Sequence, residues 1–391
     1  MTGLFNIRRY GKNKMKVLLI SHDFLPMQSP EAIRSGKYAK YLNRFGLEVF
    51  VLTTSREDPS IFSRALAHYD IIPDACGKWI KPAFEEACEI IEEEKIELII
   101  SRSMPIVSHR VALLVKKKYP NIPWIAEFSD PWTQSTYKKY KLGIGKKRDN
   151  KFEGEIFKNA DKIIATSERS AQLFLTKYPR ANVKSIPNFY DPDEFTDPYA
   201  SLKFSNRYVF IYTGNFYGIR TPEYLLKALK ELENEGETKI KVILIGNLGN
   251  FQGLIKKYNI SKELLQVLPS VKREEALELL KYANAYLLID GPSKTPSVFL
   301  PSKLPEYLYM RKPILALSPE GTVNDILKET KAGICISPED VNKIKETLKI
   351  FPTLTFPNEA NIQQYGAMEC TWDLALIMKE MVDGGKNVKN N

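Results

Sequence analysis

The stretch YVFIYTGNFYGIRTPEYLLKAL, residues 208–229, contains a strand, a tight turn and a helix in immediate succession. Its first residues form an apolar, β-branched and aromatic run that predicts a buried strand. Gly214 ends this run, and Thr-Pro-Glu at 221–223 marks the start of a helix. Arg220 stands beside that start, where a helix end already attracts anions. We therefore expect a βα unit with a phosphate-binding turn. The alternative interpretation of the same residues is an ordinary capped helix with an arginine at the surface.

The same alternation of strand and helix signals runs through most of the chain. Short runs rich in Val, Ile and Leu form one group within residues 15–187 and a second group within 208–337, with room for a helix after each run. Near-continuous apolar strands are typical of parallel sheets that helices cover on both faces. Residues 188–207, rich in Pro, Asp and Ser, separate the two groups. The predicted fold class is α/β, with two Rossmann-like doubly wound domains facing a central cleft.

These patterns also suggest domain boundaries. We place an N-terminal domain at 15–197 and a C-terminal domain at 203–360. The last apolar stretch, 361–385, has no strand of its own, and we expect a helix there that completes the N-terminal domain. Residues 1–14 contain Arg and Lys without a long apolar segment behind them, so we expect a flexible basic tail and no secretory signal.

Composition limits the functions to consider. The chain of 391 residues has 57 basic and 47 acidic side chains, a formal charge of +10, which would attract a nucleic acid, an anionic membrane or a phosphate-bearing ligand. No nucleic-acid recognition motif is present, so we expect no nucleic-acid partner. Four cysteines without CxxC spacing and only three histidines predict no metal site and a reduced, cytoplasmic protein. No apolar run approaches the roughly 20 residues that span a bilayer.

A charged pair precedes the buried-looking strand PILAL within the segment FLPSKLPEYLYMRKPILAL, residues 299–317. Lys303 and Glu306 are three residues apart and share one face of a helix. Lysine supplies a point charge for a phosphate, and a carboxylate accepts two hydrogen bonds from the vicinal hydroxyls of a ribose. The alternative is an ordinary surface pair that contributes less than about 1 kcal/mol to stability.

A wider pattern appears when the segments are read in order. MKVLLISHDFLP and the following RSGKYAKYLNRFGLEVFVLTTS open the chain, and ADKIIATSERSAQLFLTKYPRANVKSIPNFYDPDEF closes its first half. YTGNFYGIRTPEYLLKAL, KVILIGN, VLPSVKREEALELLKYANAYLLI and PSKLPEYLYMRKPILALSPEGTVNDILKETKAG follow in the second half. This ordered set resembles glycosyltransferase family 4 and extends over nearly the whole chain from about residue 15.

The resemblance implies a GT-B fold and a retaining, metal-independent hexosyl- or related transferase without a cofactor, using a UDP- or GDP-linked sugar. Arg220 and Lys303 would neutralise the donor diphosphate, and Glu306 would hold the nucleotide ribose. Asp130, after the strand PWIAEF, would meet the sugar or the acceptor hydroxyl and act in catalysis beside the two cations; the alternative is a turn aspartate before proline. The full donor-binding set that follows is Gly214, Asn215, Arg220, Gly246, Asn247, Pro269, Ser270, Lys303 and Glu306.

Two features depart from the family pattern. Val298 stands where many relatives have a first glutamate that contacts the transferred sugar, and nearby Asp290 and Ser297 receive no role. MQSPEAIRSG, residues 27–36, replaces the glycine-rich first loop. The sequence therefore leaves the identity of the sugar and the acceptor contacts open.

Acceptor contacts are expected from the first domain. His22 follows the first strand, and Arg34 opens the first long helix, where it could meet an acceptor phosphate. The segment 132–151 interleaves aromatic residues with lysines. It fits a solvated surface or contact with an anionic membrane and a lipid-linked acceptor, and a nucleic-acid patch is the third, least favoured interpretation. The family resemblance implies a saccharide or a lipid-diphosphate-linked saccharide as acceptor and a role in cell-surface polysaccharide or glycoconjugate synthesis. We therefore also expect peripheral contact with the inner membrane face.

Two other functions stay open on the sequence, and a third is disfavoured. A GT-B-fold sugar-nucleotide epimerase would convert the donor without an acceptor. A catalytically silent, glycosyltransferase-like partner subunit would fit the valine at 298. A Rossmann dehydrogenase is disfavoured because no strand is followed by GxGxxG.

Overall fold

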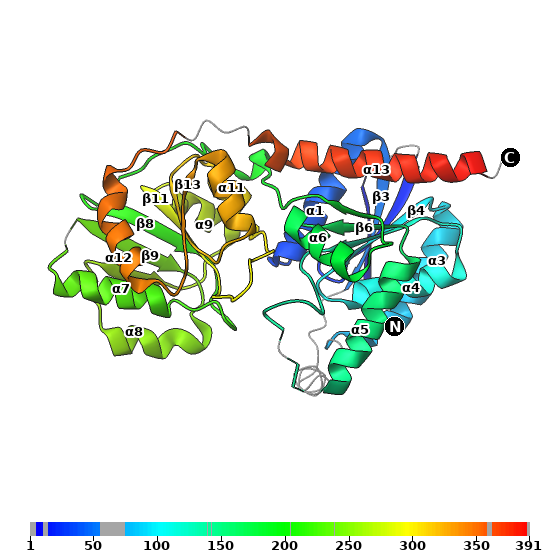
Figure 1. The fold of residues 1–391 in the computed structure, drawn as a ribbon. Helices are drawn as coiled ribbons and strands as arrows, with labels where there is room; N and C mark the ends of the chain where they lie inside the picture. Colours follow the sequence, from blue (N-terminus) through cyan, green and yellow to red (C-terminus); the bar gives the residue numbers. More distant parts are fainter. Residues whose placement is uncertain are drawn as a thin grey trace. The chain divides into compact units, whose positions relative to one another are not determined.

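The computed structural model describes residues 5–10, 15–54, 75–138, 140–141, 143–203, 205–237, 239–357 and 362–388. The chain divides into two compact units (Figure 1). The first is formed by Met1–Asn188 with Ala367–Asn391, and the second by Phe189–Gly366. Each unit is a largely parallel sheet flanked by helices, which confirms the α/β class expected from the sequence.

The sheet of the first unit has seven strands in the order β1-β3-β2-β4-β5-β6-β7. All neighbouring pairs are parallel except β1 and β3. Strands β2 to β5 are buried along nearly their whole length, which accounts for their continuous apolar runs. The strands are β1 (Phe5–Tyr10), β2 (Met15–Ile20), β3 (Leu47–Thr54), β4 (Leu98–Ser103), β5 (Trp124–Phe128), β6 (Lys162–Ala165) and β7 (Val183–Ser185).

Helices flank this sheet, and the C-terminal helix joins them. α13 packs against α1 within the first unit, where we expected a helix over 361–385 (Figure 1). Its Leu374 and Met378 are fully buried, so apolar burial ties it to this unit. The helices are α1 (Pro30–Leu42), α3 (Ile80–Glu94), α4 (Val107–Lys118), α5 (Gly143–Asn159), α6 (Glu168–Lys177) and α13 (Ala367–Val388).

The N-terminal segment corrects the expectation of a flexible tail. Residues Phe5–Tyr10 form β1, which pairs antiparallel with β3 along its whole length. Arg9 also forms an ion pair with the buried Glu48. An open sheet edge offers backbone hydrogen bonds to any extended segment that reaches it, and this pairing partner is not visible locally in the sequence. The rest of the expected tail lies outside the described residues.

The second unit has six strands, all parallel, in the order β10-β9-β8-β11-β12-β13. This order is that of the dinucleotide-binding doubly wound fold. The strands are β8 (Tyr208–Thr213), β9 (Ile240–Ile245), β10 (Leu265–Leu268), β11 (Ala285–Ile289), β12 (Ile314–Leu317) and β13 (Gly333–Ile336). The helices are α7 (Glu223–Asn234), α8 (Gln252–Tyr258), α9 (Arg273–Leu280), α10 (Lys303–Tyr309), α11 (Thr322–Thr330) and α12 (Val341–Ile350).

The boundary between the units lies at residues 188 and 189, upstream of the 197–203 segment suggested by the sequence. Residues after the boundary pack onto the second unit: the Tyr190 ring stacks on Tyr309 at 4.2 Å, and the Leu202 N–H donates to the Lys281 carbonyl oxygen at 3.1 Å. The composition of this stretch predicts a linker, but aromatic stacking and a backbone hydrogen bond attach it to the second unit.

Candidate active site

Polar residues gather at the carboxyl edge of the second sheet. The strand order reverses between β8 and β11, and open α/β sheets bind ligands in the crevice at such a point. Gly214 follows β8, Gly246 follows β9, Pro269 follows β10 and Asp290 follows β11. The turns that carry the expected donor-binding residues Gly214, Gly246 and Pro269 therefore lie along one edge of one sheet, together with Asp290.

The Asn215 side chain links the turns after three neighbouring strands. Its Oδ1 atom accepts hydrogen bonds from the backbone N–H of Asn247 at 2.9 Å and from the Ser270 hydroxyl at 3.4 Å. Pro269, next to Ser270, is exposed at the same turn. The structure thus brings together residues that the sequence places at three separate positions.

Two glycines allow these turns to lie close together. Gly214 and Gly246 have φ values of +140° and +146°, which side chains rarely permit. A Cβ atom on Gly246 would lie 2.1 Å from the carbonyl oxygen of Gly214. Any residue other than glycine at 246 would therefore force the turns after β8 and β9 apart.

Lys303 begins α10, and its ammonium donates a hydrogen bond to the carbonyl oxygen of Thr213. The Nζ atom lies 4.3 Å from the centre of the Tyr212 ring, a cation–π distance. Burial, and after it the charge of Arg220, lower the pKa of Lys303 to about 7. A bound anion would favour the charged form of this amine.

Arg220 is held near this lysine by a buried carboxylate. Its Nη2 atom lies 3.6 Å from Oδ1 of Asp290, which is 2% exposed. Asp290 also accepts hydrogen bonds from the Gly291 N–H at 2.8 Å and the Ser297 hydroxyl at 3.3 Å. The sequence motifs assign no role to Asp290, but its position directly after a buried strand, like those of Gly214 and Gly246, is a signal that points to one.

Glu306 lies one turn into α10 and is 7% exposed. Its Oε1 atom accepts a hydrogen bond at 2.5 Å from Nη2 of Arg273, a residue missed by the sequence analysis. The same Nη2 atom donates to Glu194 at 2.7 Å. Arg273 starts a different helix, so only the fold reveals this contact.

The position of the family's first glutamate is occupied by half-buried Val298. The preceding residue, Ser297, forms an isolated parallel bridge with Gly321, and the Thr322 N–H donates to the Ser297 carbonyl oxygen at 2.9 Å. The loop between β11 and α10 is thereby fixed to the start of α11. Because position 298 carries no carboxylate, the acidic side chains that act on the Lys303 amine in the described part of the chain are those of Glu306 and Asp290.

In the first unit, two expected residues lie at the carboxyl edge of the sheet. Asp130 is exposed just after β5. His22, just after β2, is 7% exposed, and its Nδ1 atom lies 2.8 Å from Oδ1 of Asp23. The Ser29 hydroxyl donates to the other Asp23 oxygen at 3.0 Å, so the imidazole is oriented by a fixed carboxylate.

Arg34 has a different environment from the one expected. It is 5% exposed, and its Nε donates to Oε1 of Glu127 at 2.7 Å. Its remaining nitrogens donate to Tyr38 at 2.6 Å and to backbone and side-chain oxygens of residues 186–188. Arg102 donates to the second Glu127 oxygen at 2.9 Å. Because its donors serve the protein interior, Arg34 has a structural role here, and we do not propose it as an acceptor contact.

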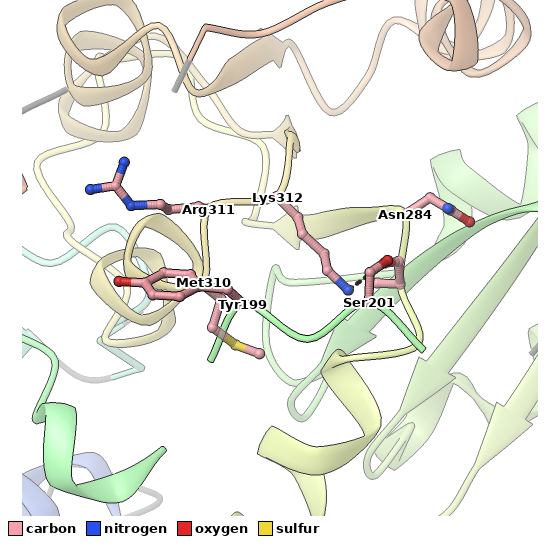
Figure 2. Close-up of a pocket in the computed structure, with 7 residues that line it drawn as sticks. Tyr199, Ser201, Asn284, Met310, Arg311 and Lys312 are labelled. Atoms are coloured by element: carbon pink, nitrogen blue, oxygen red, sulfur yellow. Dashed lines mark hydrogen bonds between the residues drawn. The ribbon is translucent and has the colours of Figure 1, made fainter. Parts of the chain in front are cut away.

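A separate pocket of about 360 Å³ lies at the amino ends of β11 and β12, the opposite edge of the second sheet (Figure 2). The Lys312 ammonium donates there to the carbonyl oxygens of Lys281 at 2.6 Å and Ala283 at 2.7 Å, which closes the end of α9. None of the expected donor residues lines it, so we do not place the donor there. The lining residues are Tyr199, Ser201, Ala283, Asn284, Met310, Arg311 and Lys312.

Within the part of the chain that the structure describes, no three His, Cys, Asp or Glu side chains are arranged to hold a metal ion. None of the described helices combines the length and apolar character required to cross a membrane.

Two family models together match most of the chain. The model for Glycosyltransferase Family 4 matches residues 37–194, and that for Glycosyl transferases group 1 matches residues 193–367. None of the curated proteins matches the chain.

Solved structures share the fold at low identity. A glycosyltransferase from Rickettsia africae ESF-5 is 15% identical with a TM-score of 0.65, covering 95% of this chain and 99% of that one. HepE from Anabaena, bound to UDP and glucose, is 14% identical with a TM-score of 0.64, covering 94% and 100%. A protein assigned as a UDP-N-acetylglucosamine 2-epimerase from Listeria monocytogenes is 13% identical with a TM-score of 0.59, covering 95% and 97%.

The two sheets, the turns at the carboxyl edge of the second one and these structural relatives define a GT-B glycosyltransferase fold. Within that class, the chain belongs to glycosyltransferase family 4. The family expected from the ordered sequence segments is therefore confirmed, and the chemistry it supports is glycosyl transfer from a nucleotide sugar.

Proposed function

We propose that this protein is a retaining glycosyltransferase that moves a hexosyl or related group from a UDP-linked donor to a saccharide or lipid-diphosphate-linked saccharide. The observation that carries the donor assignment is the convergence of Arg220 and Lys303 beside the open turn at Gly214. Two cations and backbone groups at a switch-point edge suit a diphosphate. UDP is favoured over GDP because HepE, of the same fold, binds UDP.

The proposed mechanism is positioning and electrostatic stabilisation. As the bond between the sugar and the diphosphate breaks, negative charge grows on the departing phosphate, and the two cations would stabilise it. Loss of one such group costs on the order of 3 kcal/mol of barrier, by analogy with lost oxyanion donors. Asp130 would contact the sugar or the acceptor hydroxyl from the first unit, and His22 would contribute to acceptor binding. No metal or cofactor is needed in this proposal because fixed cations supply the charge.

The acceptor proposal includes contact with an anionic membrane surface. In the segment 132–151, the structure separates two kinds of basic residue. Lys138 and Arg148 pair with the buried Asp149 at 2.7 Å each, whereas Lys146 and Lys147 are exposed near the first turn of α5. Ile144, in that first turn of α5, is 74% exposed. An exposed apolar residue among lysines is suited to an anionic lipid surface, where lipid-linked acceptors for surface polysaccharides lie.

Thermal unfolding against UDP, GDP, ADP, CMP and NAD tests the donor proposal. A ligand at about 100 times its dissociation constant adds roughly 2.7 kcal/mol, which shifts the midpoint visibly. Stabilisation by UDP that Glu306→Ala weakens would support the proposal. Stabilisation by NAD, or UDP affinity that is unchanged in Glu306→Ala, would contradict the donor-site assignment.

An epimerase remains the second candidate because a structural relative is assigned that activity. Incubation with UDP-sugars and no acceptor distinguishes the two. Conversion of the donor sugar to its epimer would favour the epimerase, whereas a new glycoside formed only with acceptor would favour the transferase. Binding of UDP without either product would support the silent-subunit alternative that Val298 suggests.

A further inference from the structure

Arg273 connects two carboxylates of the second unit at the candidate donor site. It is the first residue of α9, and its Nη2 atom donates to Oε1 of Glu306 at 2.5 Å and to Oε2 of Glu194 at 2.7 Å. Glu194 closes a short 3-10 helix, Pro192–Glu194, in the segment that enters this unit. Three parts of the chain that are far apart in sequence thus meet at one guanidinium.

The charge of Arg273 is secure despite its burial. Its side chain is 19% exposed, and those of Glu306 and Glu194 are 9% and 25% exposed. Burial alone would lower the pKa of Arg273, but the two carboxylates raise it. Without the guanidinium, the carboxylates of Glu306 and Glu194 would face each other without a shared cation, and Glu306 would lose its fixed orientation.

The contact with Arg273 leaves one of the two carboxylate oxygens of Glu306 available to bind a ligand. Arg273 binds the Oε1 atom, while the Oε2 atom has no hydrogen-bond partner in the described part of the chain. The Nε atom of Arg273 is buried and also lacks a partner there. A buried N–H group without a hydrogen-bond acceptor lowers the stability of the fold. An arginine that carries this cost is explained if its guanidinium holds the functional carboxylate of Glu306 in place.

We propose that Arg273 is a positioning residue that sets the preference of this site for ribonucleoside over 2′-deoxyribonucleoside diphosphates. By fixing Oε1 of Glu306, it directs the remaining carboxylate lone pairs toward the vicinal hydroxyls of the ribose. Two acceptor positions held in one plane suit a cis-diol, which presents two donors side by side. The inference rests on the proposed function, because it takes Glu306 as the ribose contact.

Binding of UDP and 2′-deoxy-UDP to the full chain, measured by calorimetry, tests the proposal. We expect the unaltered protein to bind UDP at least tenfold more tightly than 2′-deoxy-UDP. Arg273→Gln should weaken UDP binding at least tenfold but 2′-deoxy-UDP binding less than threefold, so that the preference largely disappears. Arg273→Lys, which keeps the charge without the planar fork, should give an intermediate preference. Lys272→Gln, an exposed neighbour, is the matched control and should change neither affinity.

A second set of variants separates positioning from general damage to the fold. Glu306→Gln should reduce the preference as Arg273→Gln does, and adding Arg273→Gln to it should cause no further loss. In Arg273→Gln, both Glu194 and Glu306 lose their shared cation, and their mutual repulsion could unfold the unit. Adding Glu194→Gln removes one of the two negative charges and so provides a folded variant for the same measurement. That double variant should show the same loss of preference.

The outcomes are distinguishable. Equal weakening of UDP and 2′-deoxy-UDP by Arg273→Gln, with the preference kept, would overturn the positioning role and leave the proposed function standing. Binding of neither nucleotide by the unaltered protein would overturn the proposed function and this inference with it.

Discussion

A Cβ atom on Gly214 would lie 2.2 Å from the Nζ atom of Lys303. The missing side chain at one position therefore provides the space for the cation at the other. Gly214 directly follows β8 and Lys303 begins α10, so two segments about ninety residues apart share one small volume at the edge of the sheet. This relationship makes both residues sensitive to small changes.

Gly214→Ala should weaken UDP binding at least tenfold, about 1.4 kcal/mol, because the new methyl group displaces the ammonium of Lys303. The positive φ at this position adds backbone strain of roughly 1–2 kcal/mol to the folded state. Calorimetric titration with UDP, together with thermal unfolding, measures both effects. Gly253→Ala, in α8 with nothing within 4 Å of the new Cβ, is the control and should leave UDP affinity unchanged. Unchanged affinity in Gly214→Ala would refute the shared-space argument.

UDP binding should weaken as the pH rises above about 7. The pKa of Lys303 is lowered to about 7 in the free protein, mainly by burial, so the amine loses its proton in this range. Bound diphosphate favours the protonated amine, and its terminal phosphate, with a pKa of about 6, is already ionised. The dissociation constant should therefore rise by up to about tenfold per pH unit until the pKa of the complex is reached.

Titrations with UDP between pH 7 and 9 measure this dependence. Lys303→Gln should bind UDP weakly with little change over that range. A flat profile for the unaltered protein would show that this amine does not change its charge on binding.

Glu127→Gln should destabilise the first unit by about 3–5 kcal/mol, because it leaves the buried Arg34 and Arg102 without their shared counter-charge. These two guanidinium groups hold the pKa of Glu127 below its usual value, although its complete burial acts in the opposite direction. Urea unfolding measures the loss. Glu155→Gln, which removes a surface pair with Lys117, should cost less than about 1 kcal/mol. A similar small cost for Glu127→Gln would show that the buried network contributes little.

Asp130→Ala should reduce turnover with acceptor far more than it weakens UDP binding. Asp130 is exposed at the carboxyl edge of the first sheet, whereas the donor-site residues belong to the second unit. We expect at least a hundredfold lower kcat, in the range of a lost catalytic group, with a change in donor affinity below threefold. Initial rates at saturating donor, paired with UDP titration, separate the two. Asp373→Ala, at an exposed position of α13, is the control, and equal rates in both variants would remove Asp130 from the mechanism.

The exposed lysines of α5 should contribute to binding of anionic membranes. Lys146→Glu with Lys147→Glu should reduce sedimentation with vesicles that contain about 30% phosphatidylglycerol, since each basic residue near such a surface contributes about 1 kcal/mol. Lys256→Glu with Lys257→Glu, on α8 of the other unit, provides a charge-matched control. Equal vesicle binding by both double variants would indicate that the net charge of the protein, and not the lysines of α5, attracts it to the membrane.

The sequence by itself determined the strand and helix alternation, the α/β class and the family. These features are local or repetitive: apolar runs mark strands, a glycine directly follows β8, and Thr221 accepts a hydrogen bond from the Glu223 N–H at 3.1 Å just before α7. The ordered motifs also pointed to Lys303, Arg220 and Glu306. Lys303 begins α10, Glu306 follows one turn later, and Arg220 lies in the short loop between β8 and α7, so all three stand close to the turns that sequence signals mark.

Only the tertiary structure decided which of these residues meet. Pairing of β1 with β3, the burial of Arg34 against Glu127 and the contact between Arg273 and Glu306 join segments that are tens of residues apart. Hydrogen bonds and ion pairs of this kind depend on the crossing of strands and helices in space, and a charged residue reads the same in sequence whether it faces a ligand or a buried partner. Composition and spacing identify the groups that can bind a phosphate or a ribose. Packing determines which of these groups already form hydrogen bonds or ion pairs within the protein and which can bind a ligand.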